Sequence, residues 1–310
     1  MNYISRSEFL KICGGLLLLL PHSDRRPDRL LLSFSTLGCP DWSLEECIDF
    51  AASHQYDGVE IRGLQRQLDL PLSKYFNSPA AVRQTKKQFQ DKGILLAGLG
   101  SSCELHHRDT VQRKKNLDEA RRFTDLAAEL DCPCIRVFPN NFPESLDRRE
   151  TMDLMSQGLN ELGNYAKGTA VKILMETHGD LVHSDDIEMV MGSVDNKNTG
   201  LVWDVANMWS VTKEPPSLMY PKLKKYIFHT HIKDLRLKNR KEEYTFVGRG
   251  EVPIFEAIDL LARDHYKGYF SFEWEKLWHP EIEAPELALA DYPLAMKHHA
   301  GMFINSIPNH

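Results

Sequence analysis

The segment "VKILMETHGDLVHSDDIEMVMGSVDNKNTGLVWDVAN" (residues 171–207) carries the pattern that decides the fold. It begins with an apolar run at 171–178, continues through a helical pattern at 184–192, and returns to an apolar run at 199–207. Continuous apolar runs are typical of parallel strands, because these are buried on both faces of the sheet. The segment therefore predicts one strand–helix–strand unit of an α/β protein.

The same unit recurs along the chain from residue 30 onward. Strand-like runs stand at 30–38, 58–63, 94–102, 134–139, 171–178, 199–207, 226–234 and 268–276, with helical patterns between them. Eight such units in about 280 residues predict a single (β/α)8 TIM barrel. An open doubly wound sheet is the alternative, but the turn "STLGCPDW" (35–42) after the first strand lacks the glycine pattern of a dinucleotide site.

Composition narrows the class of protein. No linker rich in Gly, Pro or Ser divides the chain, so residues 29–310 are predicted to form one domain. The net charge of −6 gives no basic footprint for a nucleic-acid partner. The six cysteines have no regular spacing and do not indicate a disulfide framework. The sequence leaves open whether the chain forms a homo-oligomer.

The first 28 residues differ from the rest of the chain. Their apolar stretch, Ile12 to Leu20, is too short for a stable membrane span but fits the core of an export signal. "SRSEFLK" (5–11) resembles the twin-arginine export motif, with Ser7 in place of the second arginine. We therefore expect export to the periplasm by a Tat-like or Sec signal. The alternative is a disordered N-terminal arm on a cytoplasmic protein.

Polar side chains gather where the last four predicted strands end. These ends carry Glu176 and His178, Asp204 and Asn207, His229, His231, Lys233 and Asp234, and Glu273 and Glu275. Active sites of (β/α)8 barrels lie at the carboxyl ends of the strands, so four successive strands with acids or imidazoles there indicate one shared site. A single polar strand end would indicate only a solvated terminus.

Three carboxylates and one imidazole in this group form a metal-ligand set, namely Glu176, Asp204, His231 and Glu273. Oxygen donors with one nitrogen favour Mn2+, Mg2+ or Co2+, and Zn2+ remains open. Asp234 follows His231 by three residues and is expected either to orient an imidazole from outside the ligand set or to cap a turn.

Six motifs in order along the chain carry a family resemblance: "YDGVEIRG" (56–63), "ILMETHGD" (173–180), "LVWDVAN" (201–207), "HTHIKD" (229–234), "GRGEVP" (248–253) and "GYFSFEWE" (268–275). Over residues 30–305 the chain resembles the xylose isomerase-like TIM-barrel superfamily, the sugar phosphate isomerase/epimerase family. That superfamily includes sugar isomerases and epimerases, inosose dehydratases and the endonuclease IV group. The resemblance implies the four metal ligands named above, preferring His231 to His229 and Glu273 to Glu275.

The resemblance also implies a reaction. The expected function is a metal-dependent sugar isomerase or epimerase that abstracts a proton next to a carbonyl of a sugar or polyol, with Glu176 and Glu273 as the acid–base pair. The alternative is a metal-dependent lyase or dehydratase acting on a keto-sugar or inosose. A non-catalytic carbohydrate-binding barrel is a third reading. The loop at 234–251 contains no histidine, which argues against an endonuclease.

Substrate contacts are expected from polar residues near the same strand ends. The candidates are Glu60, Arg62, His106 or His107, His178, Asn207 and Arg249. Asn207 stands where some members of the superfamily have a histidine. Four tryptophans, Trp42, Trp203, Trp209 and Trp274, are candidates for an apolar platform under a sugar ring, with core packing expected for at least two of them.

Overall fold

Eight parallel strands close into a barrel, which confirms the predicted fold. The computed structural model describes residues 30–239 and 241–306, so the predicted export segment at 1–28 lies outside the described residues. The barrel strands are β1 (Leu31–Ser35), β2 (Gly58–Ile61), β3 (Leu95–Glu104), β4 (Cys134–Phe138), β5 (Lys172–Glu176), β6 (Thr199–Asp204), β7 (Ile227–Ile232) and β10 (Tyr269–Phe272). Their order is β1-β10-β7-β6-β5-β4-β3-β2, and β1 and β2 pair to close the ring.

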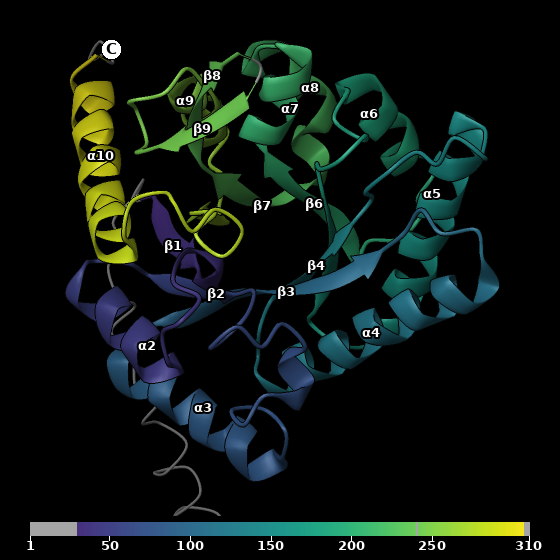
Figure 1. The fold of residues 1–310 in the computed structure, drawn as a ribbon, viewed down its shortest axis with the longest axis horizontal. Helices are drawn as coiled ribbons and strands as arrows, with labels where there is room; N and C mark the ends of the chain where they lie inside the picture. The colour runs from purple at the N-terminus through teal and green to yellow at the C-terminus, as the bar shows by residue number, and fades with distance from the viewer. Residues whose placement is uncertain (1–29, 240, 307–310) are drawn as a thin grey trace, which may run out of the picture.

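Helices surround the barrel (Figure 1). They are α2 (Leu44–Ser53), α3 (Pro79–Lys92), α4 (Thr110–Glu129), α5 (Arg148–Tyr165), α6 (Ser184–Gly192), α7 (Val205–Thr212), α8 (Pro216–Leu223), α9 (Ile254–Arg263) and α10 (Pro285–Ser306). The described residues also form three short 3-10 turns, η1 (Thr36–Gly38), η2 (Leu70–Leu72) and η3 (Lys224–Tyr226). Helix α2 begins with the capping box that Ser43 and Glu46 predict.

Aromatic side chains fix α10 against the barrel. Phe34 of β1 and Phe272 of β10 are register partners, and both are fully buried. The ring of Phe272 stacks on Tyr292 of α10 with centroids 4.8 Å apart, and the Tyr292 hydroxyl donates to the Phe270 carbonyl at 3.0 Å. Burying a side chain of this size stabilises the fold by about 2–3 kcal/mol.

Two elements differ from the sequence-based prediction. Helix α7 begins directly after β6, because the Asp204 side chain caps it by accepting from the backbone N–H of Asn207 at 2.9 Å. The segment after β7, predicted as a polar loop, contains an antiparallel hairpin of β8 (Asp234–Lys238) and β9 (Lys241–Thr245).

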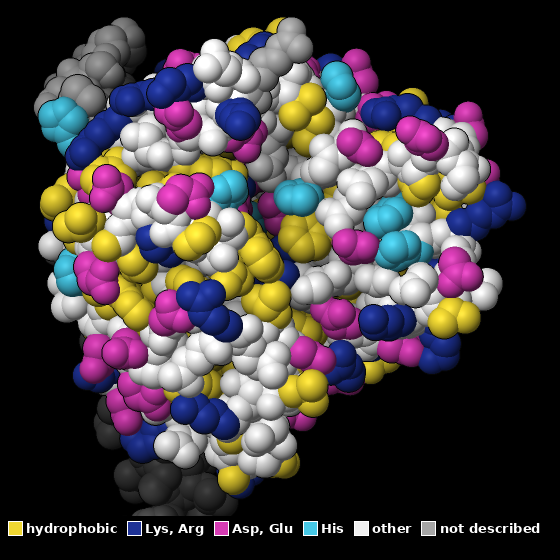
Figure 2. Space-filling model, in the orientation of Figure 1, with side chains coloured by type: hydrophobic (Ala, Val, Ile, Leu, Met, Phe, Trp, Pro, Cys, Tyr) yellow, Lys and Arg dark blue, Asp and Glu magenta, His cyan; other side chains and the backbone are white. Residues whose placement is uncertain are grey.

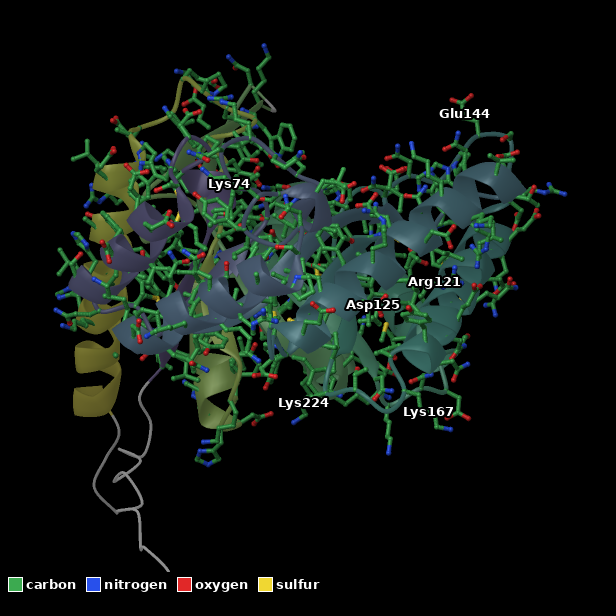
Figure 3. All side chains as sticks on the ribbon, turned by 90° about the horizontal axis from the view of Figure 1, so that it is seen from below. Lys74, Arg121, Asp125, Glu144, Lys167 and Lys224 are labelled. Carbon is green, nitrogen blue, oxygen red and sulfur yellow. The ribbon has the colours of Figure 1, made fainter. Side chains whose placement is uncertain are left out.

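The carboxyl ends of the strands open toward the viewer of Figure 1. In the side view, Glu144 in the loop after β4 lies at the upper edge (Figure 3). Lys167, which precedes β5, and Lys224, which precedes β7, lie at the lower edge. None of the helices between residues 30 and 306 that the structure describes is both long and apolar enough to cross a bilayer.

Candidate metal centre

Four strand ends bring the predicted ligand set together. Glu176, Asp204, His231 and Glu273 each offer an atom within 4.8 Å of the others, and all four side chains are buried. Asp204 and His231 are register partners on β6 and β7. Glu176 is the last residue of β5, and Glu273 directly follows β10.

The Asp204 carboxylate is oriented by its position at the start of α7. Its Oδ1 accepts the capping hydrogen bond from Asn207, so Oδ2 is turned away from the helix. The Asn207 side chain reaches the same centre, because its Nδ2 donates to Glu176 Oε1 at 3.3 Å. Asn207 therefore positions two members of the ligand set.

The two glutamates face one atom of His231. Nδ1 of His231 lies 3.4 Å from Glu176 Oε1 and 3.2 Å from Glu273 Oε1. Burial opposes a charge on the imidazole, but the carboxylates of Glu273, Glu60 and Glu176 outweigh burial and raise the pKa of His231 well above its ordinary value.

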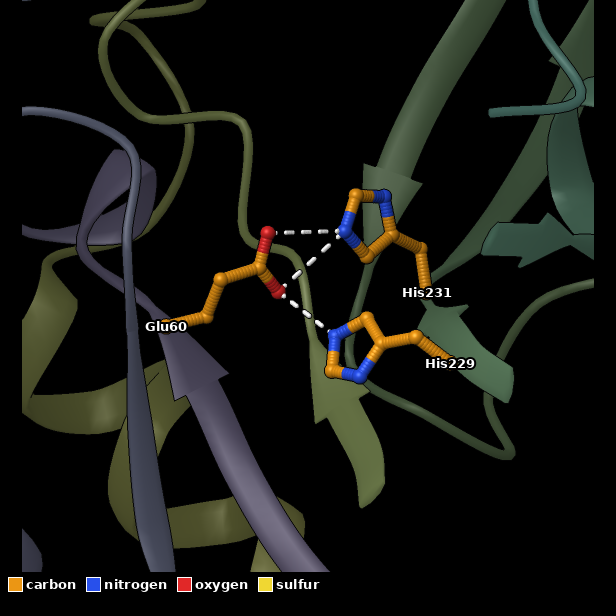
Figure 4. A group of neighbouring side chains, drawn as sticks. All are labelled: Glu60, His229 and His231. Atoms are coloured by element: carbon orange, nitrogen blue, oxygen red, sulfur yellow. Dashed lines mark hydrogen bonds and ion pairs between the residues drawn. The ribbon is translucent and has the colours of Figure 1, made fainter. Parts of the chain in front are cut away.

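Glu60 holds the opposite side of the His231 ring (Figure 4). His231 Nε2 lies 3.0 Å from Glu60 Oε1. Glu60 Oε2 lies 2.9 Å from His229 Nε2 and accepts from the Ser271 hydroxyl at 2.8 Å. A carboxylate can only accept from the imidazole, so Nε2 carries a proton. In the neutral ring, the form that binds a metal ion, Nδ1 keeps its lone pair as a ligand.

The residues of this centre fit a divalent cation. Among the described residues, Glu176 Oε2, Asp204 Oδ2 and His231 Nδ1 are buried polar atoms without a hydrogen-bond partner. Burial raises the pKa of Asp204 to about 7, although Lys233 opposes this shift. Asp204 Oδ2 forms an ion pair with Lys233, and Glu176 Oε2 lies 3.3 Å from Arg136 Nε, but neither contact has hydrogen-bond geometry. The three atoms can therefore serve as ligands of a divalent cation.

Lys233 contributes a positive charge to this centre. Its Nζ lies 2.9 Å from Asp204 Oδ2, 2.8 Å from Glu273 Oε2 and 2.7 Å from Glu275 Oε1. Burial opposes its charge, but these carboxylates dominate and raise the pKa of Lys233 well above its ordinary value. Both glutamates after β10 pair with Lys233, but Glu273 also lies in the ligand set, whereas Glu275 does not.

A cavity of about 230 Å3 opens next to the ligand set. Its lining residues are Leu37, Arg62, Arg136, Phe138, Asn140, Glu176, His178, Glu273, Glu275 and Trp278. In Figure 2 the corresponding face is hollowed near the centre, where charged and histidine side chains meet. The predicted contacts Arg62 and His178 lie on this cavity wall.

His178 is held by a chain of polar side chains. Asn140 Nδ2 donates to Glu104 Oε1, and Asn140 Oδ1 lies 3.0 Å from His178 Nδ1. Because an amide oxygen only accepts, Nδ1 of the neutral His178 carries the proton and Nε2 keeps a lone pair. Burial lowers the pKa of His178, although the Glu176 charge opposes this.

Two predicted substrate contacts, Glu60 and Arg249, lie away from the cavity, and Asp234 has the second of its two expected roles, that of a turn cap. Glu60 lies behind the imidazole of His231 and is not among the cavity-lining residues. The Arg249 guanidinium pairs with Asp291 of α10 and lies over the Phe246 ring. Asp234 caps the loop after the hairpin, because its oxygens accept from backbone N–H groups at 235, 248, 250 and 252.

Another predicted substrate contact, His106, is a buried imidazole. Its Nδ1 has no hydrogen-bond partner in the described part of the chain. Its neighbour His107 pairs with Glu104 at 2.9 Å, and these three residues form a separate potential ligand group. His106 does not line the cavity.

Several cavity residues were missed in the sequence. Trp203 and Trp274 are fully buried core residues, whereas Trp278, which is 53% exposed, lines the cavity. Arg136 lies inside the apolar run of β4, and a charge in a buried strand is a signal that could have identified it. Trp278 lies in the loop after β10, beyond the polar strand end, and gives no comparable signal.

Comparisons with known proteins show similarity to enzymes and to solved barrels. The chain is 27% identical over 269 residues to an inosose dehydratase of Clostridium perfringens, covering 76% of the chain and 83% of the relative. It is 28% identical over 156 residues to an inosose dehydratase of Clostridium botulinum; this match covers 44% of the chain and spans about half the length of that relative. Among solved structures, a D-psicose 3-epimerase of Clostridium cellulolyticum aligns with a TM-score of 0.69 at 17% identity, covering 88% of this chain and 99% of that one.

A family model also matches most of the chain. It extends over residues 48–292, from α2 to α10, and includes all four strand ends of the ligand set. The chain belongs to the xylose isomerase-like TIM barrel family.

Proposed function

We propose that this protein is a metal-dependent dehydratase that removes a proton next to the carbonyl of a keto-sugar or keto-polyol and eliminates water. The observation that carries the proposal is the buried convergence of Glu176, Asp204, His231 and Glu273 beside a cavity of monosaccharide size. The inosose dehydratases among the curated relatives support elimination over isomerisation.

The ligand set would hold one divalent ion through three carboxylates and Nδ1 of His231. Its oxygen-rich composition favours Mn2+, Mg2+ or Co2+, and Zn2+ is compatible with it. When bound, such an ion polarises the substrate carbonyl and stabilises the negative charge that develops as the neighbouring proton leaves.

The glutamates of the set are the proposed proton acceptors. Glu176 and Glu273 both line the cavity, and each places an oxygen near His231 Nδ1, at 3.4 and 3.2 Å. One of them takes the proton from carbon, and the electron pair of that C–H bond becomes the new carbon–carbon double bond. The neighbouring C–O bond then breaks.

Departure of hydroxide requires a proton donor on the cavity wall. His178 is the proposed proton carrier, because Asn140 fixes its ring through Nδ1 and leaves the Nε2 lone pair free to accept a proton. Nε2 takes the proton that the glutamate removed from carbon and delivers it to the leaving oxygen. The balance is one proton moved from carbon through glutamate and His178 to hydroxide, one water released, and both side chains restored.

A sugar epimerase is the second candidate. The specific observation in its favour is that two glutamates, rather than one, line the cavity beside the metal-ligand set. If one takes the proton from carbon and the other returns it to the opposite face, configuration inverts without loss of mass.

Isotope exchange in D2O tests both candidates. We would incubate the Mn2+-loaded protein with an inosose and a panel of ketoses and follow product mass. Loss of water with deuterium uptake supports the dehydratase, whereas uptake with conserved mass supports the epimerase. Glu176→Gln and Glu273→Gln should each reduce exchange by about 10²- to 10⁴-fold, the contribution typical of a general base.

The same experiment can reject an enzymatic role. A purified protein that binds no stoichiometric metal and exchanges no deuterium with any substrate would favour a non-catalytic carbohydrate-binding barrel. Exchange that persists unchanged in both glutamate variants would contradict the assigned acid–base pair.

A further inference from the structure

Two arginines lie side by side on the cavity wall, next to the candidate metal ligands. Arg62 follows β2 and Arg136 lies in β4, and both are almost fully buried. Gly100 of β3 lies between them, because a Cβ at that position would stand 2.7 Å from Arg62 Cδ and 3.0 Å from Arg136 Nη2. The absent side chain at Gly100 therefore makes room for both arginines.

Both guanidinium groups retain unused donors. Arg62 Nη2 donates to the Ser102 hydroxyl at 2.9 Å, but Arg62 Nη1 has no hydrogen-bond partner within residues 30–239 and 241–306. Arg136 Nε and Nη1 likewise have none; Nε lies 3.3 Å from Glu176 Oε2, outside hydrogen-bond geometry. Buried donors of a charged group are costly to leave unpaired. Because both arginines line the cavity, a ligand bound there can accept from these donors after a small adjustment of the side chains.

The carboxylates near these two charges also have other partners. Glu119, which acts on Arg62, accepts from the backbone N–H of Ser102 at 2.6 Å. Lys233 pairs with Asp204, Glu273 and Glu275. Glu176 faces Arg136, but it also belongs to the ligand set and would share its charge with a bound ion. Burial and the neighbouring charge of Arg136 lower the pKa of Arg62 to about 10, so Arg62 remains cationic at neutral pH.

We propose that Arg62 and Arg136 form a subsite for an anionic group of the substrate, which is therefore a sugar acid or a sugar phosphate and not a neutral sugar. The planar guanidinium fork matches the geometry of a carboxylate or phosphate. A hydroxyl can accept a hydrogen bond from arginine but does not neutralise it. The cavity of about 230 Å3 is below the range for drug-sized ligands, which favours a single sugar unit.

This subsite lies in the same cavity as the proposed reaction. It rests on the proposed function only in one respect, namely that the bound anion is the substrate. Binding itself requires no turnover. Equilibrium binding therefore tests the subsite separately from the deuterium-exchange assay. If anion selectivity holds, the exchange assay is repeated with acidic and phosphorylated forms of the same substrates. Failure of exchange with these forms rejects the proposed reaction and leaves the subsite standing, whereas exchange without anion selectivity rejects the subsite alone.

Three probes with one carbon skeleton distinguish the anion sources. We would measure the affinity of the full chain for D-gluconate, D-glucitol 6-phosphate and neutral D-glucitol by calorimetry. At least one anionic probe should bind 10- to 100-fold more tightly than glucitol, the range expected for charge-assisted hydrogen bonds. Selectivity for gluconate identifies a carboxylate, and selectivity for the ester identifies a phosphate. Measurements with EDTA and with Mn2+ separate the arginine contribution from anion binding to the metal.

Arg62→Met is the decisive variant, because no ion pair joins Arg62 to a proposed metal ligand. It should reduce the affinity for the preferred anion at least tenfold and change glucitol affinity less than about threefold. Arg62→Lys keeps the charge but removes the fork and should give an intermediate loss. Arg149→Met, on an exposed position of α5, is the matched control for charge and should change neither affinity.

The proposal has clear contrary outcomes. It is overturned if glucitol binds as tightly as both anions to the unaltered protein, or if Arg62→Met weakens all three probes equally while circular dichroism shows an intact fold. If Arg62→Met does not fold, the comparison of probes on the unaltered protein and on Arg62→Lys still decides the question.

Discussion

Glu60 Oε1 lies 3.0 Å from His231 Nε2, on the side of the imidazole opposite the candidate metal ligands. The two residues are 171 positions apart, and both are fully buried. A histidine that donates one N–H to a carboxylate presents its other nitrogen to a metal with a fixed ring orientation. The contact therefore makes Glu60 a positioning residue for His231 rather than a substrate contact.

We expect Glu60→Gln to weaken metal binding about 10- to 100-fold, the range seen when such outer partners are lost. Isothermal titration of metal-free protein with MnCl2 measures this directly. Ser271→Ala is the graded control, because Ser271 donates only to Glu60 and should change affinity by a smaller factor. An unchanged Mn2+ affinity in a folded Glu60→Gln protein would remove the positioning role.

The sequence was sufficient to predict the barrel, because each of its strands is an apolar run that a helical pattern follows. It failed where one residue has two roles: Asp204 ends β6 and also caps α7, so the apolar run continues into the helix without a visible break. The hairpin β8–β9 was missed because its strands are largely polar and pair only with each other.

Strand alternation was sufficient to group Glu176 with His178, and Glu273 with Glu275, since all four line the cavity. It could not show which distant side chains meet. Glu60 is a charge inside the apolar strand β2, which signals a buried partner, but its partners lie on β7 and β10. Only closure of the ring brings these strands together.

Lys233 should stabilise the metal-free protein by neutralising buried carboxylates. Lys233→Met leaves Asp204, Glu273 and Glu275 without their ammonium partner, and the loss of one member of a buried ion pair costs about 3–5 kcal/mol. We expect the free energy of unfolding in EDTA, measured with urea, to fall by this amount. Saturating Mn2+ should recover part of the loss.

Lys224→Met provides a matched comparison for that measurement. Lys224 pairs with Asp264 at 2.8 Å, and both side chains are about half exposed, so its replacement should cost less than about 1 kcal/mol. Equal losses in the two variants would mean that Lys233 does not counterbalance the carboxylate cluster.

Asp234 should govern the order of the loop between the hairpin and α9. Its carboxylate accepts four backbone N–H groups, three of them from the loop at positions 248, 250 and 252. Asp234→Ala removes these acceptors together, so amide hydrogen exchange in residues 246–252 should accelerate while exchange in the barrel strands changes little.

Gly250→Ala tests the same contact from the other side. A Cβ at Gly250 would lie 2.0 Å from Asp234 Oδ1, so the carboxylate must move away from the loop. The two variants should accelerate exchange in the same peptides. Exchange that remains slow in both would exclude Asp234 as the cap of this loop.

His106 should make the stability of the fold depend on pH near neutrality. Burial, followed by the neighbouring His107, lowers the pKa of His106 below its ordinary value of 6.5. Its Nδ1 has no partner among the described residues, so protonation would add a buried donor without an acceptor. Between the lowered pKa and about 6.5, the unfolded chain binds more protons than the folded chain.

The stability that neutral His106 gives the folded protein is therefore fully present above about pH 6.5, and it is lost as the pH falls toward the lowered pKa. His106→Gln lacks this titration. As the pH falls from about 7.5 to 5.5, the free energy of unfolding should decrease more for the unaltered protein than for His106→Gln. Urea unfolding of both proteins in EDTA measures this without a contribution from metal binding. A difference that stays constant across this range would show that His106 does not titrate differently in the folded and unfolded chains.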